Sequence, residues 1–153
     1  MDKHQLSLNN LTKTQTARFV KTLSVVNKTL PPPATILDLC ERNCLCELFE
    51  KHGYNAKNTG KVNLDVDQSI LNNSFDAVTA FEIFEHTLNP YNILKNISSK
   101  KLFATVPLRL WFSKAYRNTD DQWDNHFHEF EDWQFNWLLA ETEWKIIRTE
   151  KWY

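Results

Sequence analysis

The stretch ATILDLCERNCLCELFEKHG, residues 34–53, decides the fold of this 153-residue chain. Its first part is a short apolar run with β-branched residues, which is typical of a strand buried on both faces of a parallel sheet. Asn43 is a favourable N-cap for the segment that follows, whose apolar residues recur at helical spacing, and Gly53 suits the end of that helix. The stretch therefore predicts a strand, a loop and a helix.

The same alternation of strands and helices continues along the chain. A helix ahead of the first strand ends at the prolines of residues 31–33, and Asn89 followed by Pro90 opens a later helix. Such alternation indicates right-handed crossovers and an α/β fold with a doubly wound, mostly parallel sheet. Residues 62–73 hold at most a brief strand. Strands are predicted at residues 34–40, 54–59, 74–84, 101–108 and 145–153, and helices at residues 11–30, 44–53, 90–100 and 131–144.

Length and composition predict one domain, with residues 1–33 as an N-terminal helix and linker and residues 34–153 as the α/β core. The 18 Lys and Arg residues oppose 19 Asp and Glu residues, for a formal net charge of -1, and form no basic block. Nucleic acid is therefore not an expected partner. No stretch has the apolar length of a membrane span, and the N-terminus is polar, so we expect a cytoplasmic protein that makes no membrane contact.

The three cysteines lie in one short segment, as Cys40, Cys44 and Cys46. Their spacing, with His52 nearby, matches no common metal site, so we interpret them as free, mostly buried thiols of a reducing compartment. The chain has only two glycines, Gly53 and Gly60. Other positions with positive φ are therefore expected to carry Asn, Asp or Lys.

In an open parallel sheet, ligands bind at the carboxyl ends of the strands, where the strand order reverses. Three segments are predicted to meet there: the loop of residues 40–43, the end of the second strand, and FEIFEH at residues 81–86. The helix that begins near Cys44 directs free N–H groups at this edge, which suits a carboxylate or another anion.

Four segments of the chain resemble the successive motifs of class I S-adenosylmethionine-dependent methyltransferases. They are ILDLCERNCLCELFEKHGY, SFDAVTAFEIFEHTLNPYNIL, KLFATVPL and HFHEFEDWQFNWLLAETEWKI, and the resemblance extends over most of residues 35–153. It implies a Rossmann-like methyltransferase fold, S-adenosyl-L-methionine as the cofactor and a small-molecule substrate. The sheet of that family has more strands than this chain offers, so we expect a sheet reduced at its C-terminal end, whose open edge would allow a homodimer.

The resemblance also implies a set of cofactor-binding residues. It places Asp38 beside the amino acid moiety of the cofactor, followed by a cofactor loop of Leu39, Cys40, Glu41, Arg42 and Asn43. It places Asn58 and Thr59, at the end of the second strand, beside the ribose. It places Asp65 near the adenine, and Phe81 and Glu82 on either side of the methionine part.

The loop departs from the family, which keeps glycines where this chain has Cys40, Arg42 and Cys44. Asn43 tolerates a left-handed conformation, and Arg42 has the geometry to meet a carboxylate with two hydrogen bonds. We therefore expect a methyltransferase that binds its cofactor. Two alternatives remain open: an inactive methyltransferase-like binding or assembly module, in which Cys40 and Arg42 fill the cofactor space, and a protein that binds another adenosine compound.

Histidines and acids outside the loop have more than one interpretation. His126 and His128 are candidates for the general base, as residues bordering the substrate, or for a metal site, or they pack the loop. Glu82, Glu85 and His86 resemble a metal arrangement proposed for some quinone-pathway O-methyltransferases. We favour the simpler interpretation, in which Glu82 closes the cofactor site, the other two bond to loop backbone, and no metal binds.

The segment before the last helix is rich in aromatic residues, which form either a lid over the site or a small core beneath a long loop. On that helix, the side chains at helical spacing are predicted to lie in the core. The loop aromatics are Trp111, Phe112, Tyr116, Trp123, Phe127 and Phe130, and the helix residues are Trp133, Trp137 and Leu138.

Overall fold

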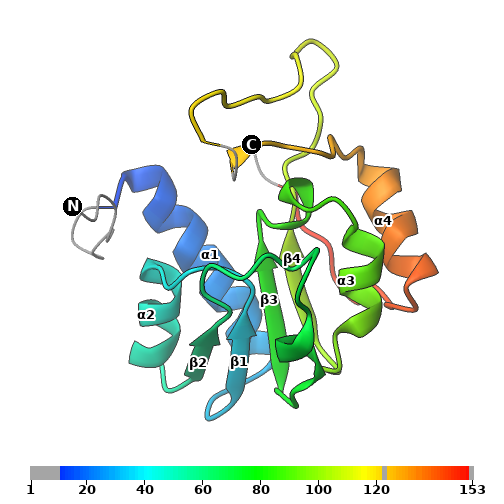
Figure 1. Ribbon diagram of the computed structural model, residues 1–153. Coiled ribbons are helices and arrows are strands. Elements are labelled where there is room, and N and C mark those ends of the chain that lie inside the picture. Colours follow the sequence, from blue (N-terminus) through cyan, green and yellow to red (C-terminus); the bar gives the residue numbers. More distant parts are fainter. Residues whose placement is uncertain (1–10, 122–123, 152–153) are drawn as a thin grey trace. The chain divides into compact units, whose positions relative to one another are not determined.

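The computed structural model describes residues 11–121 and 124–151, so Trp123 lies outside the described residues. Helices and strands alternate through most of this range, as predicted (Figure 1). In chain order the elements are α1 (Lys13–Thr29), β1 (Thr35–Asp38), α2 (Cys44–Lys51), β2 (Asn55–Asn58), the 3-10 helix η2 (Ser69–Asn72), β3 (Ala77–Phe81), the 3-10 helix η3 (Phe84–His86), α3 (Pro90–Asn96), β4 (Leu102–Thr105) and α4 (Asp132–Glu141).

The four strands form one parallel sheet in the order β2-β1-β3-β4 (Figure 1). Ile36 of β1 lies opposite Ala56 of β2 on one side and opposite Ala77 of β3 on the other. The chain passes from β1 to β2 on one side and then crosses back to β3 on the other, so the strand order reverses between β1 and β3. This confirms the predicted α/β fold with a parallel sheet, and it puts the reversal point at the carboxyl end of β1.

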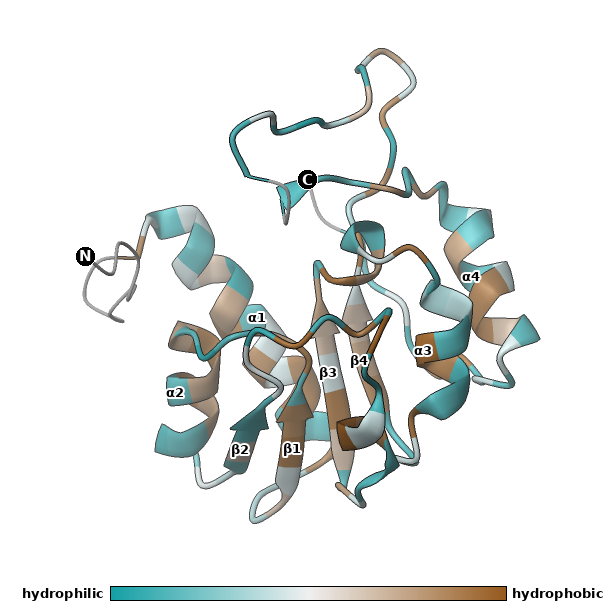
Figure 2. Cartoon of the chain, in the orientation of Figure 1, coloured by the Kyte–Doolittle hydropathy of each residue, from teal (hydrophilic) through white to brown (hydrophobic). Residues whose placement is uncertain are grey.

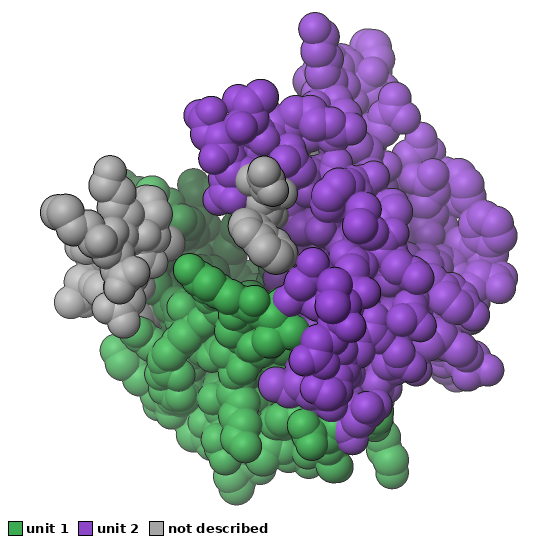
Figure 3. Space-filling model, in the orientation of Figure 1, with its two compact units in different colours: residues 1–62, 73–81, 98–104 green, residues 63–72, 82–97, 105–153 purple. Residues whose placement is uncertain are grey.

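Contacts between residues divide the chain into two compact units (Figure 3). Unit 1 comprises Met1–Val62, Asn73–Phe81 and Ser98–Ala104, and it contains α1, α2 and nearly all of the sheet. Unit 2 comprises Asn63–Asn72, Glu82–Ile97 and Thr105–Tyr153, and it contains η2, η3, α3 and α4.

The core of unit 1 lies between the sheet and its two helices. Side chains of α1, α2, β1 and β2 meet in it, so α1 and α2 cover the same face of the sheet. Leu37, which points to the opposite face of β1, is also buried, as expected for a strand of a parallel sheet. Figure 2 shows β1 as hydrophobic and β2, at the sheet edge, as hydrophilic. The buried residues of this core are Leu23, Val26, Ala34, Ile36, Leu45, Cys46, Phe49, Tyr54 and Ala56.

The predicted helix ends are present. The Asn43 side chain accepts hydrogen bonds from the backbone N–H groups of Leu45 and Cys46, which caps α2, and Gly53 follows the helix with φ +87°. Asn89 caps α3 in the same way, with Pro90 as its first residue. None of the helices in residues 11–121 and 124–151 has the length and apolar character needed to cross a membrane.

Unit 2 has its own aromatic core. The ring of Phe135 on α4 lies 5.8 Å from that of Phe84 and 5.3 Å from that of Phe130. The indole N–H of Trp144 donates to the carbonyl of Leu94, which ties the segment after α4 to α3.

Residues 63–72 form turns and η2 with no strand, in agreement with the prediction of at most a brief strand. Two other sequence predictions fail in unit 2. The described part of the predicted last strand, residues 145–151, makes no ladder hydrogen bonds to a neighbouring strand. Trp133 and Trp137 stack on each other but are 56% and 59% exposed, so they are not core residues, while Leu138 is half-buried. A pattern of side chains predicts a strand or an apolar face, but only a partner element can pair or cover it.

The loop aromatics that the structure describes do not form a core beneath the loop. Trp111, Phe112, Tyr116 and Phe127 are exposed, and Phe130 is buried. The alternative that they form a lid stays a prediction.

Asp76 joins the starts of β1 and β3. Its Oδ2 accepts hydrogen bonds from the backbone N–H of Thr35 (2.7 Å) and from the Thr35 hydroxyl (2.8 Å), and these bonds lower the pKa of Asp76. A carboxyl with a lowered folded-state pKa stabilises the fold fully above its unfolded pKa, near 4, and this contribution is lost as the pH falls through the lower folded value.

We therefore expect Asp76→Asn to lower the urea midpoint at pH 7, and we expect the difference from wild type to shrink as the pH falls from about 4 to about 2. Urea unfolding followed by circular dichroism at several pH values measures this. An equal difference at pH 7 and at pH 2 would show that the Asp76 charge is not the cause.

Candidate functional site

The carboxylate of Asp38, at the carboxyl end of β1, is the centre of a buried polar network in unit 1. Asp38 is 2% exposed. Its Oδ1 accepts a hydrogen bond from the Thr79 hydroxyl of β3 (2.5 Å), and its Oδ2 accepts from the Cys40 and Cys46 thiols (2.7 and 3.1 Å). The amide of Asn58, at the end of β2, also donates to Oδ2 (3.3 Å). The network thus joins the ends of three strands to the loop and to α2.

The Cys40 thiol of this network stays protonated at neutral pH. The hydrogen bond with Cys46, burial and the nearby Asp38 charge all raise the pKa of the Cys40 thiol. Burial also raises the pKa of the third thiol, Cys44. None of the three cysteines forms a disulfide, as predicted. A thiol whose pKa is raised, as at Cys40 and Cys44, is a poor nucleophile and a poor metal ligand.

The side chains of the loop make hydrogen bonds and ion pairs with other residues of unit 1. The Arg42 guanidinium makes two hydrogen bonds to the carboxylate of Glu50 on α2, one of 2.9 Å from Nη1 to Oε1. This pairing lowers the pKa of Glu50. The Cys40 thiol turns back onto Asp38, and Glu41 pairs with Lys61 at 3.4 Å. Arg42 therefore meets a carboxylate with two bonds, as its geometry predicts, and that carboxylate belongs to Glu50.

The backbone of this loop keeps donors available. In the part of the chain that the structure describes, the N–H groups of Glu41, Arg42 and Asn43 donate to no protein acceptor. Successive free N–H groups ahead of a helix N-terminus attract an anionic or carboxylate group. Leu39, which precedes the loop, is buried and donates its own N–H to the carbonyl of Thr79.

The predicted ribose residues at the end of β2 bond mainly within the protein. Asn58 donates to the Cys46 sulfur (2.9 Å) as well as to Asp38, and Thr59 is buried. The backbone N–H of Gly60 donates to the carbonyl of Cys40, and Gly60 has φ +70°. A turn after β2 thus supports the loop after β1.

Glu82, the first residue of unit 2 after β3, has a strained backbone. Its φ is +56°, in the left-handed region that residues other than glycine rarely adopt. Thr105, the last residue of β4, makes three hydrogen bonds with it. The Glu82 N–H donates to the Thr105 carbonyl (3.0 Å) and to the Thr105 hydroxyl oxygen (3.2 Å), and the Thr105 hydroxyl donates to the Glu82 carboxylate (2.7 Å). Strain of this kind tends to occur at functional sites, where surrounding structure maintains it. Phe81, the preceding residue, packs against the core of unit 1.

Asp65, the predicted adenine neighbour, connects two segments of unit 2. Its two carboxylate oxygens accept the backbone N–H groups of Leu88 and Asn89, each at 2.9 Å. This arrangement holds the entry to α3.

The candidate histidines of unit 2 have different neighbours. The ring of His126 lies 4.9 Å from that of His86 and 4.8 Å from that of Tyr116. The ring of His128 stacks on Phe130, and its Nε2 is buried and has no hydrogen-bond partner among the described residues. His128 therefore has the contacts of a packing histidine, whereas His126 lies in a polar cluster. The general-base role of either residue stays a prediction.

His86 bonds to loop backbone, as the simpler interpretation predicts. Its Nδ1 lies 3.1 Å from the carbonyl oxygen of Asn125. The carbonyl of the adjacent Glu85 accepts the backbone N–H groups of Phe127 and His128. The sequence suggested Glu82 as the third member of this cluster, but the structure brings His126 there, because segment 125–128 is bonded to η3.

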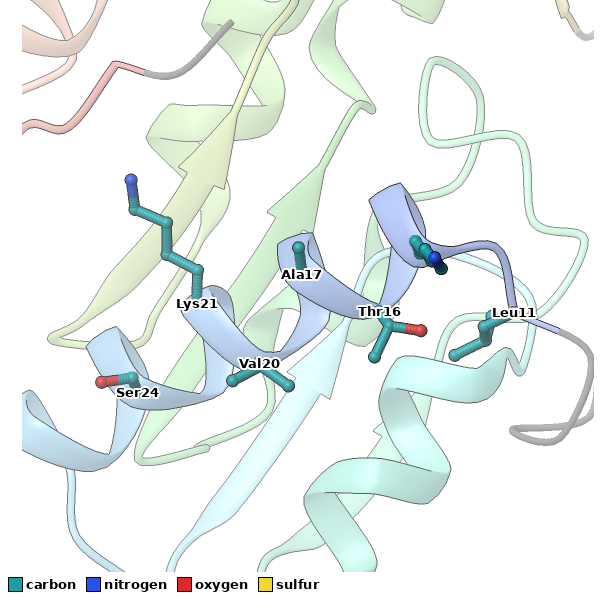
Figure 4. Close-up of a pocket in the computed structure, with 7 residues that line it drawn as sticks. Leu11, Thr16, Ala17, Val20, Lys21 and Ser24 are labelled. Carbon is teal, nitrogen blue, oxygen red and sulfur yellow. The ribbon is translucent and has the colours of Figure 1, made fainter.

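An open hollow lies elsewhere in unit 1, along the exposed side of α1 (Figure 4). Leu11, Thr16, Val20 and Ser24 are among the residues that line it. None of the predicted site residues lines it, and it offers no acid, histidine or cysteine. We assign no chemistry to it.

No protein-family model, no curated protein and no solved structure matches this chain.

Proposed function

We propose that this protein is an S-adenosyl-L-methionine-dependent methyltransferase that acts on a small molecule. The observation that carries the proposal is the state of the loop between β1 and α2. The side chains of Cys40 and Arg42 are bonded to Asp38 and Glu50, while the loop N–H groups are free of acceptors among the described residues. Such a loop can receive the carboxylate of an amino acid moiety through its backbone, without glycine.

The fold supports the same proposal. The loop follows the strand at which the order of a parallel sheet reverses, which is where open α/β sheets bind nucleotide-like ligands. Free thiols persist in a reducing compartment, which agrees with a cytoplasmic location. The homodimer through an open sheet edge stays a prediction.

Methyl transfer asks little of protein side chains. The acceptor atom attacks the sulfonium methyl group, the bond from sulfur to methyl breaks, and its electron pair stays on sulfur to give S-adenosylhomocysteine. The protein contributes alignment and a dry site. The predicted base role of His126 and His128, which is removal of a proton from the acceptor, is therefore not a condition of the proposal.

A second candidate function is a methyltransferase-like module that binds or assembles without catalysis. One observation favours it: the Asp38 carboxylate is already saturated by donors from Thr79, Cys40, Cys46 and Asn58. An acid that is engaged in this way contributes less to a bound amino acid moiety than an open one.

Calorimetric titration of the 153-residue chain with S-adenosylmethionine and with S-adenosylhomocysteine tests the proposal. We expect saturable binding of both, and we expect Arg42→Ala to bind within about twofold of wild type, because its guanidinium is occupied by Glu50. Adenosine and ATP serve as comparison ligands. If neither S-adenosylmethionine nor S-adenosylhomocysteine bound at millimolar concentration, the proposal would be rejected. Tighter binding of ATP or adenosine would indicate that the natural ligand is another adenosine compound.

A second measurement separates the two candidate functions. Protein, methyl-labelled cofactor and a small-molecule extract are incubated, and labelled products are resolved by chromatography. A labelled product that requires the protein identifies an enzyme. Saturable cofactor binding without any labelled product, over several extracts, favours the binding module.

A further inference from the structure

A cluster of one acid and two histidines lies in unit 2, outside the cofactor loop. Glu85, His86 and His126 each offer one ligand atom, and these atoms all lie within 4.8 Å of one another. It is the one such group of three or more potential metal ligands within residues 11–121 and 124–151. Glu85 and His86 belong to η3, and His126 comes from a loop 40 residues later.

Backbone hydrogen bonds fix the two segments to each other. The carbonyl of Glu85 accepts the N–H of Phe127 at 2.7 Å and that of His128 at 3.2 Å, so the two residues that follow His126 are attached to η3. The backbone segments that carry the three ligand atoms are therefore held together by hydrogen bonds, as a metal site requires.

The outer nitrogens of both histidines already have partners. Nδ1 of His86 faces the carbonyl oxygen of Asn125 at 3.1 Å, which requires a proton on Nδ1 and leaves the lone pair on Nε2. Nδ1 of His126 faces Oε1 of Glu129 at 3.5 Å, and the backbone N–H of Tyr116 holds that oxygen at 2.9 Å. Histidines that bind metals usually donate their other ring nitrogen to a carbonyl or carboxylate in this manner.

The surroundings favour a cation. Glu85 is 1% exposed, and its Oε1 lies 3.8 Å from Nε2 of His86, within ion-pair distance. A buried carboxylate is costly unless positive charge compensates it. The Asp124 carboxylate, two residues before His126, accepts hydrogen bonds from the Tyr116 hydroxyl (2.7 Å) and the Asn118 amide (2.9 Å).

We propose that Glu85, His86 and His126 bind a divalent first-row transition-metal ion, with Zn²⁺ preferred, through one Glu85 oxygen and Nε2 of each histidine. One oxygen and two imidazole nitrogens suit Zn²⁺, and Mg²⁺ and Ca²⁺ prefer sites made of oxygen alone. Three protein ligands leave a fourth position open for water or for an oxygen of a bound molecule.

A tetrahedral ion holds its ligand atoms about 3.4 Å apart, so binding draws the three side chains slightly closer. Bound in this way, His126 is a ligand and not a general base. The metal site does not depend on methyl transfer, and its test uses no cofactor.

The test is a titration of the metal-free 153-residue chain with Co²⁺, read by visible absorption, followed by competition with Zn²⁺. We expect one tight site per chain. His126→Ala and the isosteric Glu85→Gln should each weaken binding at least about tenfold, and Glu129→Gln should weaken it about tenfold by releasing the His126 ring. His52→Ala, which removes an exposed histidine of unit 1, is the matched control and should bind like wild type.

A wild-type measurement covers the case in which a variant does not fold. In histidine ring ¹⁵N spectra, one equivalent of Zn²⁺ should shift Nε2 of His86 and of His126 and leave His52 and His128 unchanged. Wild-type affinity in folded His126→Ala, or shifts confined to other histidines, would overturn the proposal. So would the absence of a stoichiometric site, or equal affinity for Mg²⁺.

Discussion

Replacing Asp38 with alanine is expected to lower the free energy of unfolding by about 3 kcal/mol. The carboxylate is the shared acceptor for Thr79, Cys40, Cys46 and Asn58, and it is 2% exposed. Without it, several buried donors lose their acceptor and water has little access to replace it. Urea unfolding followed by circular dichroism measures the loss.

Thr79→Val is the matched control for Asp38→Ala. It removes one donor but leaves the other donors on the carboxylate, so we expect a loss of about 1 kcal/mol. A free energy of unfolding for Asp38→Ala within about 0.5 kcal/mol of wild type would mean that the network does not stabilise the fold. The cofactor affinity of Asp38→Ala is interpretable only where the variant remains folded.

Truncation of Phe49 to alanine is expected to cost about 4 kcal/mol. Phe49 lies on the inner face of α2, is fully buried, and contacts Tyr54 edge to face with ring centroids 5.7 Å apart. Its removal leaves a cavity between α2 and the sheet, because close-packed neighbours relax only partly. The same urea experiment gives the free energy.

Two controls accompany Phe49→Ala. Phe49→Leu keeps most of the volume and should cost less than about 1.5 kcal/mol. Phe112→Ala makes the same change at a residue that is 70% exposed, and it should stay within about 0.5 kcal/mol of wild type. Equal losses at positions 49 and 112 would contradict the assignment of the core.

The helix ends of this protein were predictable because their signals are local. Asn43 caps α2 through N–H groups two and three residues away, and Gly53 supplies a positive φ just after that helix. Such interactions are complete within a few residues, so a short stretch of sequence contains both partners. The prediction that other positions with positive φ carry Asn, Asp or Lys was wrong: among the described residues they are Glu82 and Glu143. At Glu82, three hydrogen bonds with Thr105, the last residue of β4, maintain that conformation.

The last strand and the face of α4 could not be predicted correctly from a pattern alone. Residues 145–153 have the composition of a strand, but a strand exists only where a neighbour accepts its hydrogen bonds. Trp133 and Trp137 have the helical spacing of core residues, yet both are exposed. The spacing identifies side chains that share a face, and only packing decides whether that face is covered.

The candidate sites divide in the same way. A parallel sheet brings the ends of neighbouring strands to one edge, so the meeting of Asp38 with Asn58 followed from the order of strands. The inclusion of Cys46 did not, because its contact with Asp38 depends on how α2 packs against the sheet. His126 joins Glu85 and His86 through a loop closure over 40 residues, for which the sequence contains no local signal.

By itself, the sequence determined the α/β class, the parallel strands and the capped helices, because periodicity and caps act over a few residues. Only the tertiary structure decided where the loop side chains point, which aromatic faces stay exposed and which histidine lies beside Glu85. These outcomes depend on contacts between residues far apart in the chain, whose free energies are decided by packing and desolvation in the folded state.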